Sequence, residues 1–275
     1  MDNIPLLIMI GFVVGTLGTL IGAGGGFILV PILLFAYPGL KPEVITSISM
    51  AIVACNALSG TVAYAGAGRI DYRAGIWFAI LTIPGSVLGA LATKYIPKSL
   101  FSILFGILLI ILAAYLLLKK EKKLIETSST VLKTGWKQHS FTDNTGEAYS
   151  YTYNQSLGLV ISFIVGFISP ILGIGGGIIH VPALTNWLRF PVHIATATSH
   201  FVLLIMSLVT VMVHLYEGNY NDSLVIRLVI FLGIGVIAGA QLGAYLSNAI
   251  KGNVIIKALG LSLGLVGLRM LILYL

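Results

Sequence analysis

Three consecutive glycines interrupt an apolar run twice in this chain. The first triplet occupies residues 24–26 in the segment GAGGGFILVPIL, and the second occupies residues 175–177 in GIGGGIIHVPAL. Each glycine costs a helix interior about 1 kcal/mol relative to alanine. In hydrocarbon, a broken helix also leaves backbone polar groups without water. The motif therefore predicts two membrane helices, each broken at a point that protein or a cavity covers.

The composition places these breaks in a membrane. The 275 residues are 57% hydrophobic and 9% charged, with a mean hydropathy of +1.02, which is typical of a polytopic α-helical membrane protein. None of the nine acidic residues lies within an apolar run, whereas proton and cation transporters commonly keep one there. A pathway in this chain therefore suits an anion or a neutral solute. The dispersed basic residues argue against nucleic-acid binding, and the single Cys55 excludes an intramolecular disulfide.

The apolar runs follow the same order in the two halves of the chain. A broken segment (5–37 or 156–188) is followed by three spans, which are 43–64, 76–95 and 100–118 in residues 1–118, and 194–216, 224–246 and 254–275 in residues 156–275. Pro31 and Pro182 are expected in the first turn of half-helices that begin just after the triplets, where N–H groups lack partners. The predicted fold is an all-α polytopic membrane protein with two internal repeats, each a glycine-broken helical hairpin plus three transmembrane helices.

Residues 119–155 form the long polar linker between the repeats. Aromatic and polar residues alternate around an Asn/Gly turn in residues 141–153, which predicts a β-hairpin; a flexible linker is the alternative. Re-entrant broken segments place 11 Lys and Arg on the linker side and 5 on the other, and single crossings give 10 and 6. Both arrangements put the linker in the cytoplasm. The length of the broken segments favours re-entrant hairpins, which give inverted halves and both termini outside.

The twin glycine motifs ending in Val-Pro-x-Leu, the glycine-rich third span and the polar linker resemble the TauE/SafE family of sulfite exporters and four-toluene-sulfonate uptake permeases. The resemblance covers nearly the whole chain. It implies a secondary transporter of small sulfur-containing anions, such as sulfite, a sulfonate or sulfoacetate, in a prokaryotic cell membrane and without a cofactor. An anion channel and a proton-coupled importer of an organosulfonate are the alternatives. The spans contain no carboxylate pair, nucleophile–base set or metal cluster, so an enzyme is not expected.

The candidate site residues are those that depart from the apolar pattern. Helix N-termini offer N–H groups and partial positive charge, so the two triplets are candidates to face one oxyanion from opposite sides; the alternative is that they only allow close packing. Early hydroxyls in the following spans can bind the same anion or bond their own backbone. His180 falls where the first repeat has Leu29. The candidates are Gly24, Gly25, Gly26, Thr46, Ser47, Ser49, Asn56, Gly175, Gly176, Gly177, His180, Thr198, Ser199 and His200.

The partners expected from the sequence are a small anion and the lipid bilayer. The oligomeric state stays open, a homo-oligomer included.

Overall fold

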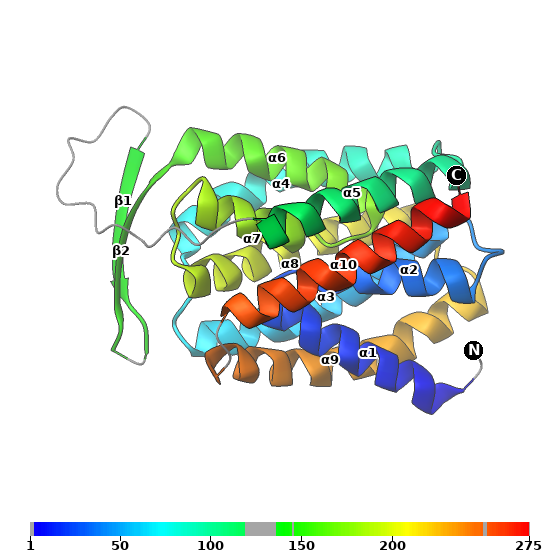
Figure 1. Ribbon diagram of the computed structural model, residues 1–275, viewed down its shortest axis with the longest axis horizontal. Coiled ribbons are helices and arrows are strands. Elements are labelled where there is room, and N and C mark those ends of the chain that lie inside the picture. The colour runs from blue at the N-terminus through cyan, green and yellow to red at the C-terminus, as the bar shows by residue number, and fades with distance from the viewer. Residues whose placement is uncertain (1–2, 119–135, 145, 250–251, 275) are drawn as a thin grey trace.

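A computed structural model describes residues 3–118, 136–144, 146–249 and 252–274. These ranges contain ten helices and two strands (Figure 1). The first half consists of α1 (Ile4–Ile21), α2 (Gly26–Ala36), α3 (Pro42–Gly66), α4 (Tyr72–Thr93) and α5 (Lys98–Leu118). The strands are β1 (Trp136–Thr142) and β2 (Ala148–Asn154). The second half consists of α6 (Gln155–Leu172), α7 (Gly177–Asn186), α8 (Val192–Tyr216), α9 (Ser223–Ala249) and α10 (Gly252–Tyr274).

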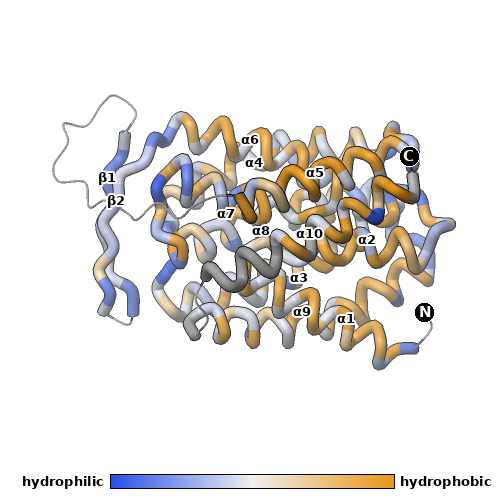
Figure 2. Tube along the Cα trace, in the orientation of Figure 1, coloured by the Kyte–Doolittle hydropathy of each residue, from blue (hydrophilic) through white to orange (hydrophobic). Residues whose placement is uncertain are grey.

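Helix length and hydropathy identify the membrane-spanning part. Within the described residues, seven helices are long and apolar enough to cross a bilayer, namely α1, α3, α4, α5, α6, α8 and α9. α2 and α7 have 11 and 10 residues, about half of what a crossing needs. Figure 2 shows apolar residues along the bundle and hydrophilic residues gathered at the end that carries the strands. The prediction of an all-α polytopic membrane fold is confirmed.

Glycine conformations make both breaks. Gly22, Gly24 and Gly25 follow α1 with φ values of 79°, 76° and 82°, a region that strains any residue with a Cβ atom. Gly173 and Gly175 follow α6 with φ values of 65°. α2 and α7 then begin at the last glycine of their triplets, where the sequence places the half-helices.

The two prolines lie one turn later than the sequence suggests. Pro31 and Pro182 are inside α2 and α7. Because these helices begin at Gly26 and Gly177, the prolines fall in the second turn, and their assignment to the first turn is wrong. A proline there cannot donate to the carbonyl four residues before it. Packing around the short helices, more than their internal hydrogen bonds, therefore holds them in place.

The two halves contact each other through pairs of helices, with one helix of each pair from each half. α1 packs against α9 and α6 packs against α4, while α3 pairs with α8 and α5 with α10. The breaks are in reciprocal contact as well. A Cβ atom on Gly26 would collide with the carbonyl oxygen of Gly173, and one on Gly177 would collide with the carbonyl oxygen of Gly22. Each half thus packs its helices against helices of the other half, and the backbones of the two breaks are in direct contact.

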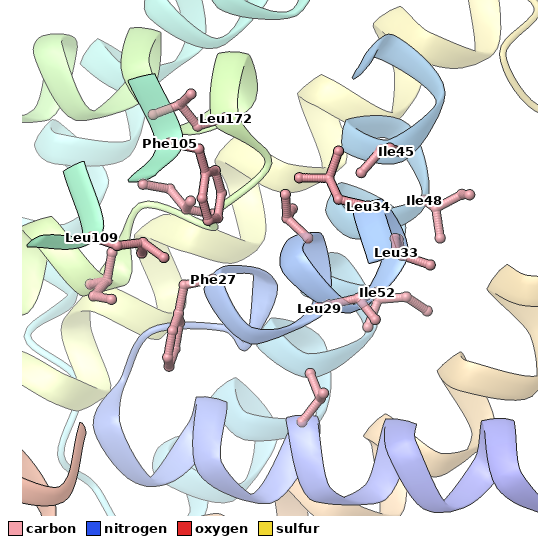
Figure 3. Close-up of a cluster of buried hydrophobic side chains, with 14 of the residues drawn as sticks. Phe27, Leu29, Leu33, Leu34, Ile45, Ile48, Ile52, Phe105, Leu109 and Leu172 are labelled. Carbon is pink, nitrogen blue, oxygen red and sulfur yellow. The ribbon is translucent and has the colours of Figure 1, made fainter. Parts of the chain in front are cut away.

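Protein covers the first break on all sides. Phe27, Leu29 and Leu33 of α2 are no more than 2% exposed. Figure 3 shows them among buried side chains of α3 and α5, which include Ile45 and Phe105. Burial of this kind meets the requirement that irregular backbone at membrane depth be shielded from lipid.

β1 and β2 form an antiparallel pair in the polar linker, in the register Trp136 with Asn154 to Thr142 with Ala148. This pair, here called the ribbon, lies across one end of the helix bundle, and both chain termini lie at the opposite end (Figure 1). The predicted hairpin is present, but only β2 follows the alternating stretch of residues 141–153, because β1 begins five residues before it. Linker residues 119–135 are outside the described part.

Candidate functional site

A small cavity lies at the N-terminus of α7. Its volume is about 10 Å³, roughly what one water molecule requires. No charged side chain lines it. The lining residues are Thr82, Val165, Gly176, Gly177, His180, Ser199, Val202, Leu203 and Met206. In this conformation the cavity is therefore too small for anything much larger than water.

Two buried hydroxyls, one in the lining of the cavity and one beside Gly176, have no hydrogen-bond partner within the described structure. Ser199 lines it and is 1% exposed, and its Oγ is unpaired. The Oγ of Ser169 is also unpaired, and it lies 2.9 Å from the position that a Cβ atom of Gly176 would take. Unsatisfied polar groups inside proteins are uncommon and costly. With the N–H groups that open α7, these hydroxyls form a set of uncommitted donors.

His180 is 2% exposed and pairs with Ser162, since its Nε2 lies 3.3 Å from Ser162 Oγ. The Ser162 hydroxyl donates to the carbonyl of Gly158 at 2.7 Å, so it accepts from His180 Nε2–H. A neutral imidazole has one N–H. His180 therefore has no second N–H for a ligand while it is neutral, and the donors left for the cavity are Ser199, Ser169 and the backbone.

The corresponding side chains of the first half have hydrogen-bond partners. Ser49 corresponds to Ser199, because α3 and α8 begin 150 residues apart and have equal lengths. The Ser49 hydroxyl donates to the carbonyl of Gly173 at 2.6 Å. By the same offset Asn56 corresponds to Met206, which lines the cavity. Asn56 is fully buried and donates to the carbonyl of Gly15 at 3.1 Å.

Asn56 is the centre of a separate polar group. Its Oδ1 accepts from the Thr19 hydroxyl at 2.7 Å and lies 3.4 Å from Nε2 of His200. The Tyr64 hydroxyl donates to the carbonyl of Thr19 at 3.0 Å, and its ring meets His200 edge-on. Asn56 thus bonds with Thr19 and His200, while Nδ1 of His200 has no hydrogen-bond partner in the described structure. His200 thus belongs with the first-half residues and does not line the cavity.

Besides Ser49, Asn56 and His200, described above, the structure separates the sequence candidates into three groups. Gly176, Gly177, His180 and Ser199 lie together at the cavity. Thr46 and Ser47 donate to carbonyls of their own helix, while the Oγ1 of Thr198 accepts from the backbone N–H of Asp71 at 3.0 Å. All six glycines of the triplets are in close packing contacts, where an added Cβ atom would meet neighbouring atoms within 3 Å; those that do not line the cavity are Gly24, Gly25, Gly26 and Gly175. The two half-helix starts therefore face each other, and the cavity belongs to one of them.

Sequence reasoning missed Ser162, Ser169 and Thr82. Aligning α1 with α6 at the offset of the glycine motifs, 151 residues, pairs Ser162 with Gly11 and Ser169 with Gly18. The second half thus has two serines and His180 where the first half has two glycines and Leu29. This contrast was available in the sequence once the repeat was extended from the glycine motif into the preceding helix. Thr82, on α4, had no such signal.

Asp71 was also missed, because it was expected at a span end. It is 5% exposed and caps α4 by accepting from the N–H of Ala74 at 3.0 Å. Within the described residues there is no group of three or more metal-binding side chains.

Comparisons with known proteins agree with this architecture. The family model described as "Sulfite exporter TauE/SafE" matches residues 7–270. The chain is 33% identical to the Bacillus subtilis probable membrane transporter protein YunE, over 97% of this chain and 96% of that protein. It is 30% identical to a probable membrane transporter protein of Methanocaldococcus jannaschii, over 98% and 96% respectively. No solved structure matches. The chain therefore belongs to the TauE/SafE family of membrane transporters.

Proposed function

We propose that this protein is a secondary transporter of a small sulfur-containing oxyanion, of the sulfite, sulfonate or sulfoacetate class, and that it works as an exporter or facilitator. One observation carries the proposal. The cavity lies at a buried half-helix N-terminus and combines unpaired hydroxyl donors with a lining that has no charged side chain. The family's description as a sulfite exporter supports the sulfur chemistry.

Helix N-termini, backbone N–H groups and hydroxyls are the donors that sulfonate and sulfite oxygens accept. These donors attract an anion although they carry no fixed positive charge. The anion can therefore be released as well as bound. Gly176 lines the cavity with bare backbone because it carries no Cβ atom, whereas the place of a Cβ atom on Gly177 is taken by the carbonyl oxygen of Gly22. Ser199 supplies the hydroxyl, and His180 fixes the wall through Ser162.

The small volume of the cavity favours a carrier over an open channel. A site that holds about one water molecule has to expand to accept an oxyanion. We infer that the two halves are inverted repeats that rock against each other. The exchanged helix pairs and the facing breaks support this inference, because such repeats place broken helices at the membrane midplane.

We also infer that the ribbon is cytoplasmic and that both termini are outside, in the cell membrane of a prokaryote. Lysine and arginine are concentrated in the linker, and such residues favour the cytoplasmic side. An impermeant thiol reagent applied to single-cysteine variants tests this orientation. Ribbon and termini labelled from the same side of the membrane would refute it.

Energetics favour export. An anion that leaves a cell with a negative interior gains about 2.3 kcal/mol per charge per 100 mV, so export needs no coupled ion. Import has to overcome that cost, most simply with protons. The acidic residues buried in the described structure, Asp71 and Asp143, lie at the ribbon end and not at the cavity. Only histidines are therefore placed to carry a proton through the bundle.

The first test is a thermal-shift screen of the purified protein against sulfite, sulfate, thiosulfate, sulfoacetate and taurine. A ligand of the folded state raises the apparent melting temperature by mass action. We expect sulfite or a sulfonate to do so in the wild type and much less in Ser199→Ala. A shift of equal size in both proteins would remove Ser199 from the site.

The second test is flux of that ligand in proteoliposomes, with membrane potential and pH gradient imposed separately. Saturable flux driven by potential alone supports an exporter or facilitator. Uphill uptake that follows the pH gradient and is lost in His180→Ala or His200→Ala would show a proton-coupled importer instead. A unitary current in bilayer recordings would show a channel.

A further inference from the structure

The ribbon is fastened to the α3–α4 loop of the first half by a set of polar contacts. His139 Nδ1 and the Tyr151 hydroxyl lie 2.7 Å and 2.5 Å from Oδ2 of Asp71. Arg69 Nε lies 3.3 Å from Asp143 Oδ2. All these groups are buried or nearly so. Burial, followed by the charge of Asp71, raises the pKa of the Tyr151 hydroxyl, so this hydroxyl stays protonated and donates to the carboxylate.

The same ribbon is packed on the α7–α8 loop of the second half. The rings of Tyr151 and Tyr153 lie 4.5 Å and 5.1 Å from the ring of Phe190, measured between centroids. The guanidinium of Arg189 lies over the ring of Trp136 at 5.7 Å. The ribbon therefore joins one loop of each half across the end of the bundle, as Figure 1 shows.

Two short chains of contact lead from the ribbon to the cavity. In the first, the backbone N–H of Asp71 donates to Thr198, whose neighbour Ser199 lines the cavity. In the second, the Phe78 ring meets the ring of Tyr153 at 6.1 Å and that of His180 at 5.8 Å. Phe78 is fully buried, so it fills the space between the ribbon and the cavity wall.

The ribbon has little reason to be ordered except this docking. An isolated two-stranded hairpin is marginal in water. The contacts that hold it are hydrogen bonds and ring contacts of modest strength and the buried ion pair of Arg69 with Asp143. A structure held in this way can leave and return without unfolding the helices.

We propose that the ribbon is the gate of the cavity at this end of the bundle and that Asp71 holds the ribbon in the closed position. When the ribbon detaches from Asp71, Phe78 can move, and this movement opens the way to Ser199 and His180. The proposal rests on the site described under the proposed function. It names the ribbon as the part of the chain that regulates access to that site.

The first test cross-links the gate shut. In a Cys55→Ala background, cysteines replace Ala67 and Asn144, which are joined by a backbone hydrogen bond of 3.2 Å. Oxidation should lower flux in proteoliposomes at least tenfold, and a reductant should restore it. The control is the pair Ser140→Cys and Ser150→Cys, which are exposed cross-strand partners within the ribbon. Its cross-link should leave flux unchanged. Full flux in a completely cross-linked Ala67/Asn144 pair would overturn the proposal.

The second test needs no knowledge of the substrate. Ser199→Cys in the same background provides a thiol in the cavity, and its labelling by a small impermeant thiol reagent added on the ribbon side reports opening. Tyr151→Phe removes one hydrogen bond to a carboxylate, so labelling should become roughly tenfold faster. Asp71→Asn should act in the same direction, since asparagine still caps α4. Tyr153→Phe keeps the ring that meets Phe78 and should change the rate less than twofold.

The two tests separate the two proposals. Faster labelling in Tyr151→Phe, without flux of any sulfur anion by the wild type, supports the gate and refutes the proposed substrate. If the wild type shows sulfite flux and neither Tyr151→Phe nor Asp71→Asn changes the labelling rate, the gate proposal is refuted. The transporter proposal then remains in place.

Discussion

The two glycine breaks have the same backbone plan and different surroundings. In the first half, Ser49 donates to the carbonyl of Gly173 across the contact between the two breaks, and Asn56 donates to the carbonyl of Gly15 in α1. At the second break, Ser199 and Ser169 have no partner in the described structure, and a cavity remains beside Gly176. The contrast supports the proposal that the first repeat serves as support while the second holds the site. A pair of breaks that looks symmetric in sequence thus differs in its polar surroundings.

The largest effect should come from the glycines where the breaks touch. Gly26→Ala and Gly177→Ala each push a Cβ atom into a carbonyl oxygen of the opposite break. Backbone cannot yield as a flexible side chain can, so both variants should fail to give folded protein, and equally in the two halves. Size-exclusion chromatography after extraction measures this. Gly39→Ala, which has open space around it, is the control. If Gly177→Ala folds and Gly26→Ala does not, the packing at the two breaks is not equivalent.

The next largest effect should come from Asn56. Asn56→Ala leaves the carbonyl of Gly15, the Thr19 hydroxyl and His200 without their partner. We expect a loss of about 3 kcal/mol in the free energy of unfolding. Met206→Leu at the matching position of the second half conserves volume and should cost less than about 1.5 kcal/mol. Thermal melts in detergent compare the two. Equal losses would contradict the view that the first half is the support.

Matched serines should give opposite effects on stability and binding. Ser49→Ala leaves the carbonyl of Gly173 without its donor and should lower stability by about 1–2 kcal/mol, with little change in anion affinity. Ser199→Ala removes an unpaired hydroxyl, so stability should change by less than about 0.5 kcal/mol while Kd rises roughly tenfold. Melting temperature and ligand titration measure both quantities. The opposite pattern would move the site to the first half.

The smallest effects should come from Thr46 and Ser47. Their hydroxyls donate to the carbonyls of Glu43 and Val44 in the same helix. Removing such a hydrogen bond costs little stability. Thr46→Val and Ser47→Ala should therefore keep flux within about twofold of wild type. A flux assay at equal protein density decides. A loss comparable to that of Ser199→Ala would return these hydroxyls to the site.

Much of the fold could be predicted because it depends on local patterns. Apolar runs indicated the spans, Gly-rich breaks indicated the half-helices, and aromatic–polar alternation located β2 and the presence of a hairpin, although β1 begins earlier than the alternation does. The misplaced prolines show the limit of this logic. Pro31 and Pro182 were assigned by their local preference for a first turn, whereas the buried surroundings hold them in the second turn.

The site was predicted only in part. The glycine motif and the replacement of Leu29 by His180 pointed to the break that the cavity adjoins, while the sequence treated both breaks alike. Ser162 and Ser169 were not predicted, because they differ from the first half only when the helix before each glycine motif is aligned with its counterpart. Asp71 looked like an ordinary loop acid until the ribbon was seen to cover it.

The sequence alone determined the membrane class, the two repeats and the positions where the helices break, because composition, periodicity and glycine content act within a few residues. The tertiary structure decided which break keeps an open cavity. That choice depends on whether a hydroxyl meets a carbonyl from the other half: Ser49 reaches Gly173 across 124 positions of chain, and Ser199 reaches no such group. Partners so far apart in the chain are brought together only by packing, so no local pattern can distinguish these two serines.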